Sequence, residues 1–270
     1  MKKPTVLCLG PRFSYSHIAA MQKFPEGEFV FLSPHTEVLK RFLAGEGDYA
    51  LVPIHNTNEG PVLPILKGVA KALLDGQVLH LIDRVDLPIK HCFAKKQGSN
   101  PSEIRSHVQA LGQCSEWIYS SGLQTFGVGS TSLAAQMSAE SDGSIAAICS
   151  ETAAKHYDLE IVSSEIVNLD NENTTTFHVL SRKPNGLDKG EYRTELFFFP
   201  ENKPGTLHTA TGPAALAGVN LCEILSFYLS NELVFHVVLE GKPDEEVVDW
   251  VISGMRRFSK KLLIIGSYKL

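Results

Sequence analysis

The stretch Tyr49–Gly60, YALVPIHNTNEG, passes from an apolar run into a polar exit. Its first half, YALVPI, predicts a buried β-strand, and a helical pattern begins near Val62, soon after the polar exit. A strand followed by a helix is the unit of a parallel or mixed sheet, in which ligands bind beyond the carboxyl ends of the strands. The segment HNTNEG is therefore a candidate for ligand contact.

The same alternation extends to both sides of this stretch. In the amino-terminal part we predict strands over residues 4–10 and 29–33 and helices over residues 16–24, 36–44 and 62–74. In a second set we predict strands over residues 87–94, 125–130 and 146–150, and helices within residues 102–121, over 132–139 and from 151 to 155. Polar residues gather at the turns of both sets, so two α/β lobes facing each other across a cleft would bring them together.

The carboxyl-terminal part has a different order of elements. Residues 183–192 are rich in Pro, Gly and charge and predict a linker. Residues 193–270 then read strand, helix, strand, strand, helix, strand. This order predicts a ferredoxin-like βαββαβ unit.

Composition excludes several classes of protein. With 43% hydrophobic and 20% charged residues the chain is not disordered, and a net charge of -5 without a basic, aromatic-rich cluster argues against nucleic-acid binding. No apolar run reaches membrane-spanning length, and Gly10-Pro11 interrupts the first apolar run, so we expect a cytoplasmic protein that does not bind membranes. The five cysteines and ten histidines show no metal-ligand spacing, and we expect no metal and no cofactor.

Six blocks of sequence occur in the order in which one family carries them: GPRFSYSHIAA, VPIHNTNEGPV, SHVQALGQC, STSLAA, AAICSETAAKHYDL and NENTTTFHVL. Over nearly its whole length the chain resembles the prephenate dehydratase family. The resemblance implies two periplasmic-binding-protein-like α/β lobes with a cleft between them, followed by a ferredoxin-like ACT domain. The implied boundaries are a catalytic part over 1–182 (lobe one about 1–80 plus 163–182, lobe two about 81–162), a linker over 183–192 and an ACT-like domain over 193–270.

The resemblance also implies a substrate and a site. Prephenate carries two carboxylates and a ring hydroxyl, and the family's triplet threonine, here Thr175, would donate a proton or hydrogen bond to the departing hydroxyl. The candidate substrate-binding residues are Ser14, Ser16, Asn56, Thr57, His107, Gln109, Ser130, Thr131, Asn173 and Phe177. Several have an alternative structural role, because Ser130 and Thr131 precede a predicted helix and His107 and Gln109 follow Ser106, a possible helix cap.

Two departures from the family motifs fall in this site. His55 stands where the family usually has Glu, and Thr176 stands where the triplet usually has Arg. Loss of a charged hydrogen-bond donor typically costs about 1.5 to 3 kcal/mol, and Arg12, Arg84 and Lys90 are candidates to replace the missing charge. Three hydroxyls at Thr174–Thr176 are also simply compatible with a strand.

These departures leave three functions open. The favoured hypothesis is a non-aromatising decarboxylation of prephenate to dihydro-4-hydroxyphenylpyruvate, with Thr175, His55 and Thr176 as catalytic residues. The alternative is a prephenate dehydratase that forms phenylpyruvate, and the third is a catalytically inactive protein that binds an aromatic metabolite.

Residues of the ACT-like part are candidates for regulation. By resemblance, Gly205, Thr206 and Leu207, together with Asn220, would contact an amino-acid ligand. The second ligand segment of the family aligns with Leu225–Tyr228, which carries no charge, so we expect a role in dimerisation rather than phenylalanine feedback. The expected partners are the small-molecule substrate and other copies of the chain, in a homodimer or homotetramer.

Overall fold

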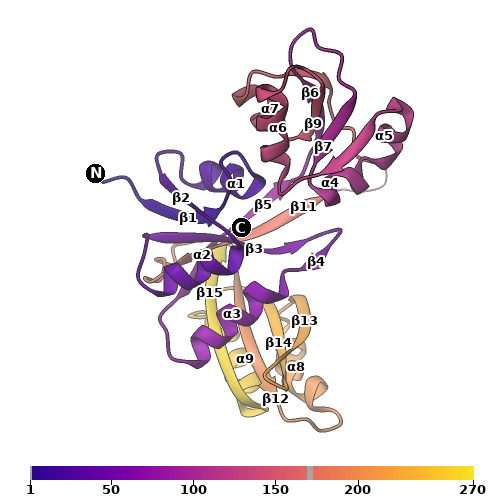
Figure 1. Cartoon of the computed structure of the whole chain (residues 1–270). Coiled ribbons are helices and arrows are strands. Elements are labelled where there is room, and N and C mark those ends of the chain that lie inside the picture. Colours follow the sequence, from indigo (N-terminus) through magenta and orange to yellow (C-terminus); the bar gives the residue numbers. More distant parts are fainter. Residues whose placement is uncertain (1, 169–172) are drawn as a thin grey trace.

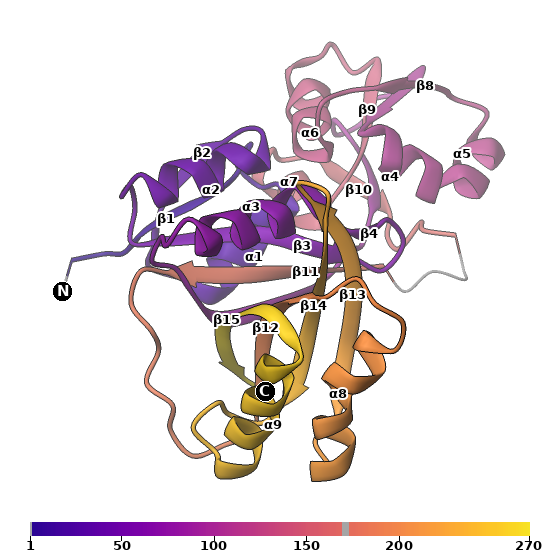
Figure 2. The same cartoon turned by 90° about the horizontal axis from the view of Figure 1, so that it is seen from below.

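The structure, a computed structural model, describes residues 2–168 and 173–270. Within these ranges the strands form two sheets, one of ten strands and one of five, which Figures 1 and 2 show as separate bodies. The prediction of two α/β lobes is confirmed. No helix in the described ranges is long and apolar enough to span a membrane.

The large sheet contains strands from both ends of the chain. In pairing order its strands are β13 (Leu221–Leu229), β14 (Glu232–Glu240), β12 (Tyr192–Pro200), β15 (Ser259–Lys269), β5 (His80–Pro88), β11 (Thr174–Ser181), β3 (Tyr49–Asn56), β1 (Thr5–Leu9) and β2 (Glu28–Leu32), with β4 (Gly60–Pro61) beside β3. Strand β11 is antiparallel to both of its neighbours, β3 and β5. A segment from late in lobe one is therefore enclosed by strands from the first third of the chain.

Helices cover both faces of this part of the sheet. They are α1 (Tyr15–Lys23), α2 (His35–Leu43) and α3 (Leu63–Leu74). Alternate residues of β11 face opposite ways: Phe177 and Val179 pack in a core with α1, whereas Leu180 packs in a core with α2 and α3. The side chains of β11 are thus divided between two environments.

The small sheet forms the second lobe. Its pairing order is β10 (Glu160–Ser163), β6 (Cys92–Lys95), β9 (Ile145–Cys149), β7 (Glu103–Ser106) and β8 (Gln124–Gly127). Its helices are α4 (Val108–Gln113), α5 (Ser115–Ser121), α6 (Thr131–Glu140) and α7 (Glu151–His156). The sequence pattern did not reveal β7, because four residues are too few to show an alternation.

The prediction of one strand over residues 87–94 is wrong. The chain leaves the large sheet at Pro88, the end of β5, and enters the small sheet at Cys92, the start of β6. The expected start of lobe two near residue 81 accordingly falls inside β5. Apolar alternation continues through the crossover, and alternation alone does not say which sheet a strand joins.

The carboxyl-terminal unit has the predicted βαββαβ order, with α8 (Thr206–Ala217) and α9 (Glu246–Arg257) as its helices. Both helices pack on its strands in a separate core. Strand β15 pairs with β5 where Gly266 lies opposite Leu81. A Cβ atom at Gly266 would lie 2.1 Å from the carbonyl oxygen of Leu81, and Gly266 has a φ of 152°. Glycine is therefore required where the two parts of the large sheet meet.

Candidate active site

Thr175 lies at the centre of a polar cluster at the first residues of β11. Nδ2 of Asn56 donates to Oγ1 of Thr175 over 2.9 Å and contacts Oδ1 of Asn173 at 2.7 Å. Oδ1 of Asn56 accepts from the backbone N–H groups of Asn58 and Glu59, each at 3.0 Å. This turn fixes the Asn56 amide, so its NH2 group points to Thr175.

The cluster continues into the second lobe. Nδ2 of Asn173 donates to Oε1 of Gln113 over 3.0 Å, and Nε2 of His91 lies 3.1 Å from the same oxygen. Nδ1 of His91 lies 2.9 Å from the hydroxyl of Tyr15 on α1. A continuous series of polar contacts therefore joins α1, the β5–β6 crossover, the end of α4 and the start of β11.

Burial sets the protonation of two members of this series. His91 is 3% exposed, and burial lowers its pKa in spite of the opposing contact with Gln113. Burial also raises the pKa of Tyr15 well above its usual value. Both side chains are therefore neutral near pH 7, as a buried hydrogen-bonded series requires.

His55 and Thr176 do not belong to this cluster. The register of β3 and β11 shifts by one residue, so that Phe177 lies opposite Pro53 but Thr176 lies opposite His55 and Thr175 opposite Asn56. Side chains of directly opposed residues share a face of the sheet. The two departures from the family motifs are thus neighbours on the face turned away from Thr175.

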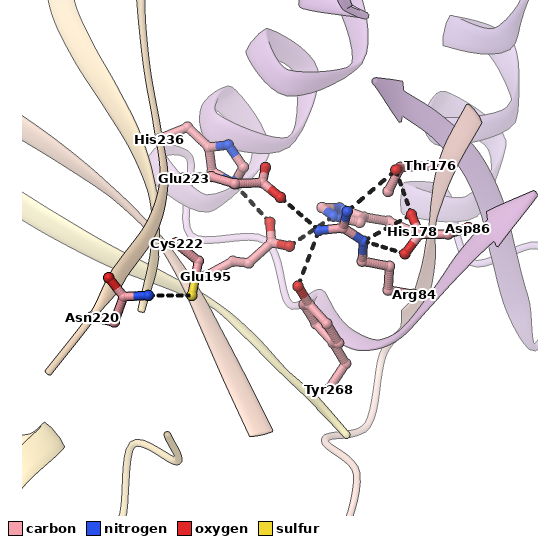
Figure 3. A network of polar contacts seen from close by, with 10 residues as sticks. All are labelled: Arg84, Asp86, Thr176, His178, Glu195, Asn220, Cys222, Glu223, His236 and Tyr268. Carbon is pink, nitrogen blue, oxygen red and sulfur yellow. Dashed lines mark hydrogen bonds and ion pairs between the residues drawn. The ribbon is translucent and has the colours of Figure 1, made fainter. Parts of the chain in front are cut away.

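Thr176 has its own partners on that other face. It is 5% exposed, and its hydroxyl donates to Oδ1 of Asp86 over 2.5 Å. Nη2 of Arg84 lies 3.4 Å from Oγ1 of Thr176, an arrangement that Figure 3 shows. Of the three cations that could replace the missing arginine, Arg84 supplies a guanidinium beside Thr176, from the neighbouring strand.

Other predicted residues lie at helix starts. Ser14 caps α1, His107 caps α4 and Ser130 caps α6 through their side chains. The expected cap of α4 was Ser106, but its hydroxyl instead donates to the carbonyl of Ile148 over 2.6 Å. Ser16 and Thr131 are buried, and Gln109 is exposed.

The start of α6 meets the loop before α1. Oγ of Ser132 donates to the carbonyl of Arg12 over 2.5 Å, and the ring of Phe13 lies 3.8 Å from that of His156 on α7. These contacts bring the capped starts of α1 and α6 to the same lobe junction. Backbone N–H groups at helix starts favour anions, so both are suited to a carboxylate.

Phe13 adopts a φ of 62°, in the left-handed region that glycine adopts without strain. Its N–H donates to Nδ1 of His17 over 2.9 Å. His17 is 3% exposed, and burial, aided by the charge of Arg12, lowers its pKa to about 4. A neutral imidazole therefore accepts the hydrogen bond that holds this turn.

The remaining predicted residues have diverse placements. Phe177 is 1% exposed in the α1-facing core and lies beneath the cluster rather than in it. Oγ1 of Thr57 accepts from the N–H of Thr174 over 3.0 Å. The candidate regulatory residues Gly205, Thr206 and Leu207 begin α8, and Asn220 precedes β13. Among the described residues no group of His, Cys, Asp and Glu side chains is arranged to hold a metal ion.

Sequence reasoning missed Gln113 and His91 as members of the cluster. Gln113 belongs to the quoted block SHVQALGQC, which was the available signal for it. His91 lies in the segment between β5 and β6, which was predicted as part of one strand. Because β5 and β6 belong to different sheets, the structure places His91 between the two lobes.

The fold and the Thr175 cluster define a two-lobed α/β protein with a polar site at the lobe junction and a βαββαβ unit at its carboxyl end. The family model for prephenate dehydratase matches residues 6–185. The chain belongs to the prephenate dehydratase family, whose members are lyases.

Individual relatives agree with this assignment. The chain is 31% identical to arogenate dehydratase/prephenate dehydratase 2 of Arabidopsis thaliana, over 96% of this chain and 71% of the relative. Its structure is similar to prephenate dehydratase of Arthrobacter aurescens in complex with L-Phe (28% identity, TM-score 0.86, 98% and 90% coverage). It is also similar to GqqA, described as a novel type of quorum quenching acylase (26% identity, TM-score 0.87, 98% and 97% coverage).

Proposed function

We propose that this chain is a prephenate dehydratase, which converts prephenate into phenylpyruvate, carbon dioxide and water. The observation that carries the proposal is the contact between Asn56 and Thr175. Since Oγ1 of Thr175 accepts from Nδ2 of Asn56 at 2.9 Å, the hydroxyl proton of Thr175 is the group that can be donated to a substrate. A positioned donor of this kind assists the departure of a poor leaving group.

The reaction needs little else from the protein. The bond from the ring to its carboxylate breaks and its electron pair enters the ring. The ring hydroxyl departs as water with the proton of Thr175, and a proton from solvent then restores the Thr175 hydroxyl. Aromatisation drives the step, and the starts of α1 and α6 are suited to hold the substrate carboxylates. The non-aromatising decarboxylation expected from the sequence is not supported, because it required His55 and Thr176 to share the site of Thr175.

Acylase activity is a second candidate, since GqqA is structurally similar to the chain. A hydroxyl nucleophile needs a neighbouring base that takes its proton. The amide NH2 group of Asn56 donates to Thr175 and cannot act in this way. The contact therefore favours proton donation by Thr175 over nucleophilic attack.

The test is incubation of the purified chain with prephenate at neutral pH, with products identified by proton NMR and mass spectrometry before any acid treatment. Phenylpyruvate is expected. A dihydro-4-hydroxyphenylpyruvate would overturn the dehydratase proposal, and unchanged prephenate would favour a binding protein. Arogenate should be tested in parallel, because the Arabidopsis relative is named for both substrates.

The carboxyl-terminal unit is proposed to be an ACT domain, in line with its βαββαβ order. Ligand contact by Gly205, Thr206, Leu207 and Asn220 stays a prediction, as do the homodimer or homotetramer and the cytoplasmic location. Light scattering of the purified chain tests the assembly, and a monomer would contradict it.

A further inference from the structure

Arg84 on β5 joins the strand that carries Thr175 to the carboxyl-terminal unit. Its Nε lies 3.1 Å from each oxygen of Asp86, which in turn accepts from Thr176 on β11. Its Nη1 donates to Oε1 of Glu223 on β13 over 2.9 Å and to the hydroxyl of Tyr268 on β15 over 3.1 Å. Figure 3 shows the guanidinium between these four partners.

A second set of contacts also joins β11 to the carboxyl-terminal unit. Glu195 on β12 is completely buried, and its two oxygens lie 3.1 Å from Nε2 of His178 on β11 and 2.7 Å from Nε2 of His236 on β14. Burial alone would raise the pKa of Glu195, but the two histidines outweigh burial and lower it. Glu195 therefore binds β11 as a carboxylate.

Both links end on the same face of β11, at Thr176 and His178. Thr175 is the residue before Thr176 on β11, nearer the lobe junction, and its side chain lies on the opposite face of the sheet. Thr175 and Thr176 are consecutive residues of one strand, so a displacement of the Thr176 backbone also displaces the backbone of Thr175. A misplacement of about 1 Å in a reacting group can cost roughly a hundredfold in rate.

We propose that Arg84 is a positioning residue for Thr175, and that Glu223 of the carboxyl-terminal unit sets the orientation of its guanidinium. The inference rests on the proposed function, because Thr175 is taken as the proton donor. Arginine suits this role, since its planar fork reaches several acceptors in fixed directions. The side chain of Arg84 is 15% exposed, whereas that of Glu223 is 43% exposed. Removing the charge of Glu223 consequently perturbs the link with little effect on folding.

The experiment compares Glu223→Gln with Glu232→Gln in the full chain. Glu232 is a matched control, because it is an exposed acidic residue of the same unit whose ion-pair partner, Lys260 at 3.8 Å, also belongs to that unit. We expect Glu223→Gln to lower kcat about five- to tenfold with KM within about twofold, as for an interaction made in the transition state. Arg84→Lys should lower kcat by a similar factor. In the double variant the factor by which kcat falls should be smaller than the product of the two single factors.

Hydrogen exchange of the β11 amides gives a readout that does not depend on activity. Glu223→Gln should exchange faster than wild type around Thr175, and Glu232→Gln should not. Unchanged kcat and unchanged exchange in Glu223→Gln would overturn the positioning role, as would equal losses in both variants. A wild-type chain that forms no phenylpyruvate would instead overturn the proposed function, and the exchange data would still decide whether Glu223 orders β11.

Discussion

His55 and Thr176 lie directly opposite each other on β3 and β11, on the face of the sheet turned away from Thr175. The family motifs usually carry Glu and Arg at these two positions, which are an oppositely charged pair. Here the two positions carry His and Thr, and Arg84 on β5 places a guanidinium on this face. The two departures therefore lie side by side, outside the Thr175 cluster.

Replacement of Thr175 tests proton donation. Thr175→Val keeps the shape of the side chain but removes the hydroxyl, and we expect kcat to fall by roughly a hundredfold or more. Thr175→Ser keeps the hydroxyl and should retain activity within about tenfold. Phenylpyruvate formation measures both, with circular dichroism as the check on folding. Normal activity in Thr175→Val would remove Thr175 from the mechanism.

The variant Asn56→Asp tests the hydrogen bond to Thr175 while keeping the turn that the Asn56 side chain forms. The new carboxylate can still accept from Asn58 and Glu59, so the turn should persist. It has no donor for Thr175, and a lost hydrogen bond of about 1.4 to 2.8 kcal/mol corresponds to a ten- to hundredfold fall in kcat/KM. Steady-state kinetics checks this, and an unchanged kcat/KM would show that Asn56 does not orient Thr175.

Thr176→Arg should not restore a more active enzyme. Thr176 is 5% exposed and donates to Asp86, and a second guanidinium would lie beside Arg84. We expect a loss of more than about 2 kcal/mol in the free energy of unfolding. Urea denaturation measures it. Adding Arg84→Thr should recover part of the loss, and a stable Thr176→Arg with raised kcat would contradict this account.

The buried, neutral side chain of His17 makes the free energy of unfolding decrease at acidic pH. Its pKa is about 4 in the folded chain against an ordinary 6.5, so between these values the unfolded chain binds more protons. The stability from neutral His17 is complete above pH 6.5 and is lost as the pH falls toward 4, by at most about 3 kcal/mol.

His17→Asn is the matched variant for this pH effect, because its amide oxygen can accept from Phe13 but does not titrate. Urea denaturation of both proteins from pH 7 to pH 4 should show a difference in stability that shrinks as the pH falls. A difference independent of pH would contradict the assignment to His17.

Gly266→Ala tests the joint between β15 and β5. The added carbon would lie 2.1 Å from the carbonyl of Leu81, so the strands must separate, and we expect a loss of more than about 2 kcal/mol in the free energy of unfolding. Gly186→Ala is the control, because nothing lies within 4 Å of the added carbon. Thermal unfolding compares the two, and equal melting temperatures would show that the joint tolerates a side chain.

The sequence by itself determined the local elements of this protein. Alternation and helical periodicity placed the strands and helices of the amino-terminal part within one or two residues, since both patterns depend on near neighbours. Ser130 could be interpreted as a helix cap for the same reason. The blocks of sequence pointed to the family and to Thr175, Asn56 and Asn173.

Only the tertiary structure decided which residues share the site. Asn56 and Thr175 are 119 residues apart in sequence, and their contact depends on the one-residue register shift that leaves Ile54 without an opposed partner on β11. Without that bulge, strict alternation would have put His55 opposite Thr175. Pairing between distant strands is a non-local property, and a shift of one residue exchanges the two faces of a strand. For that physical reason the sequence identified the residues of the motifs but did not show on which face of the sheet each side chain lies.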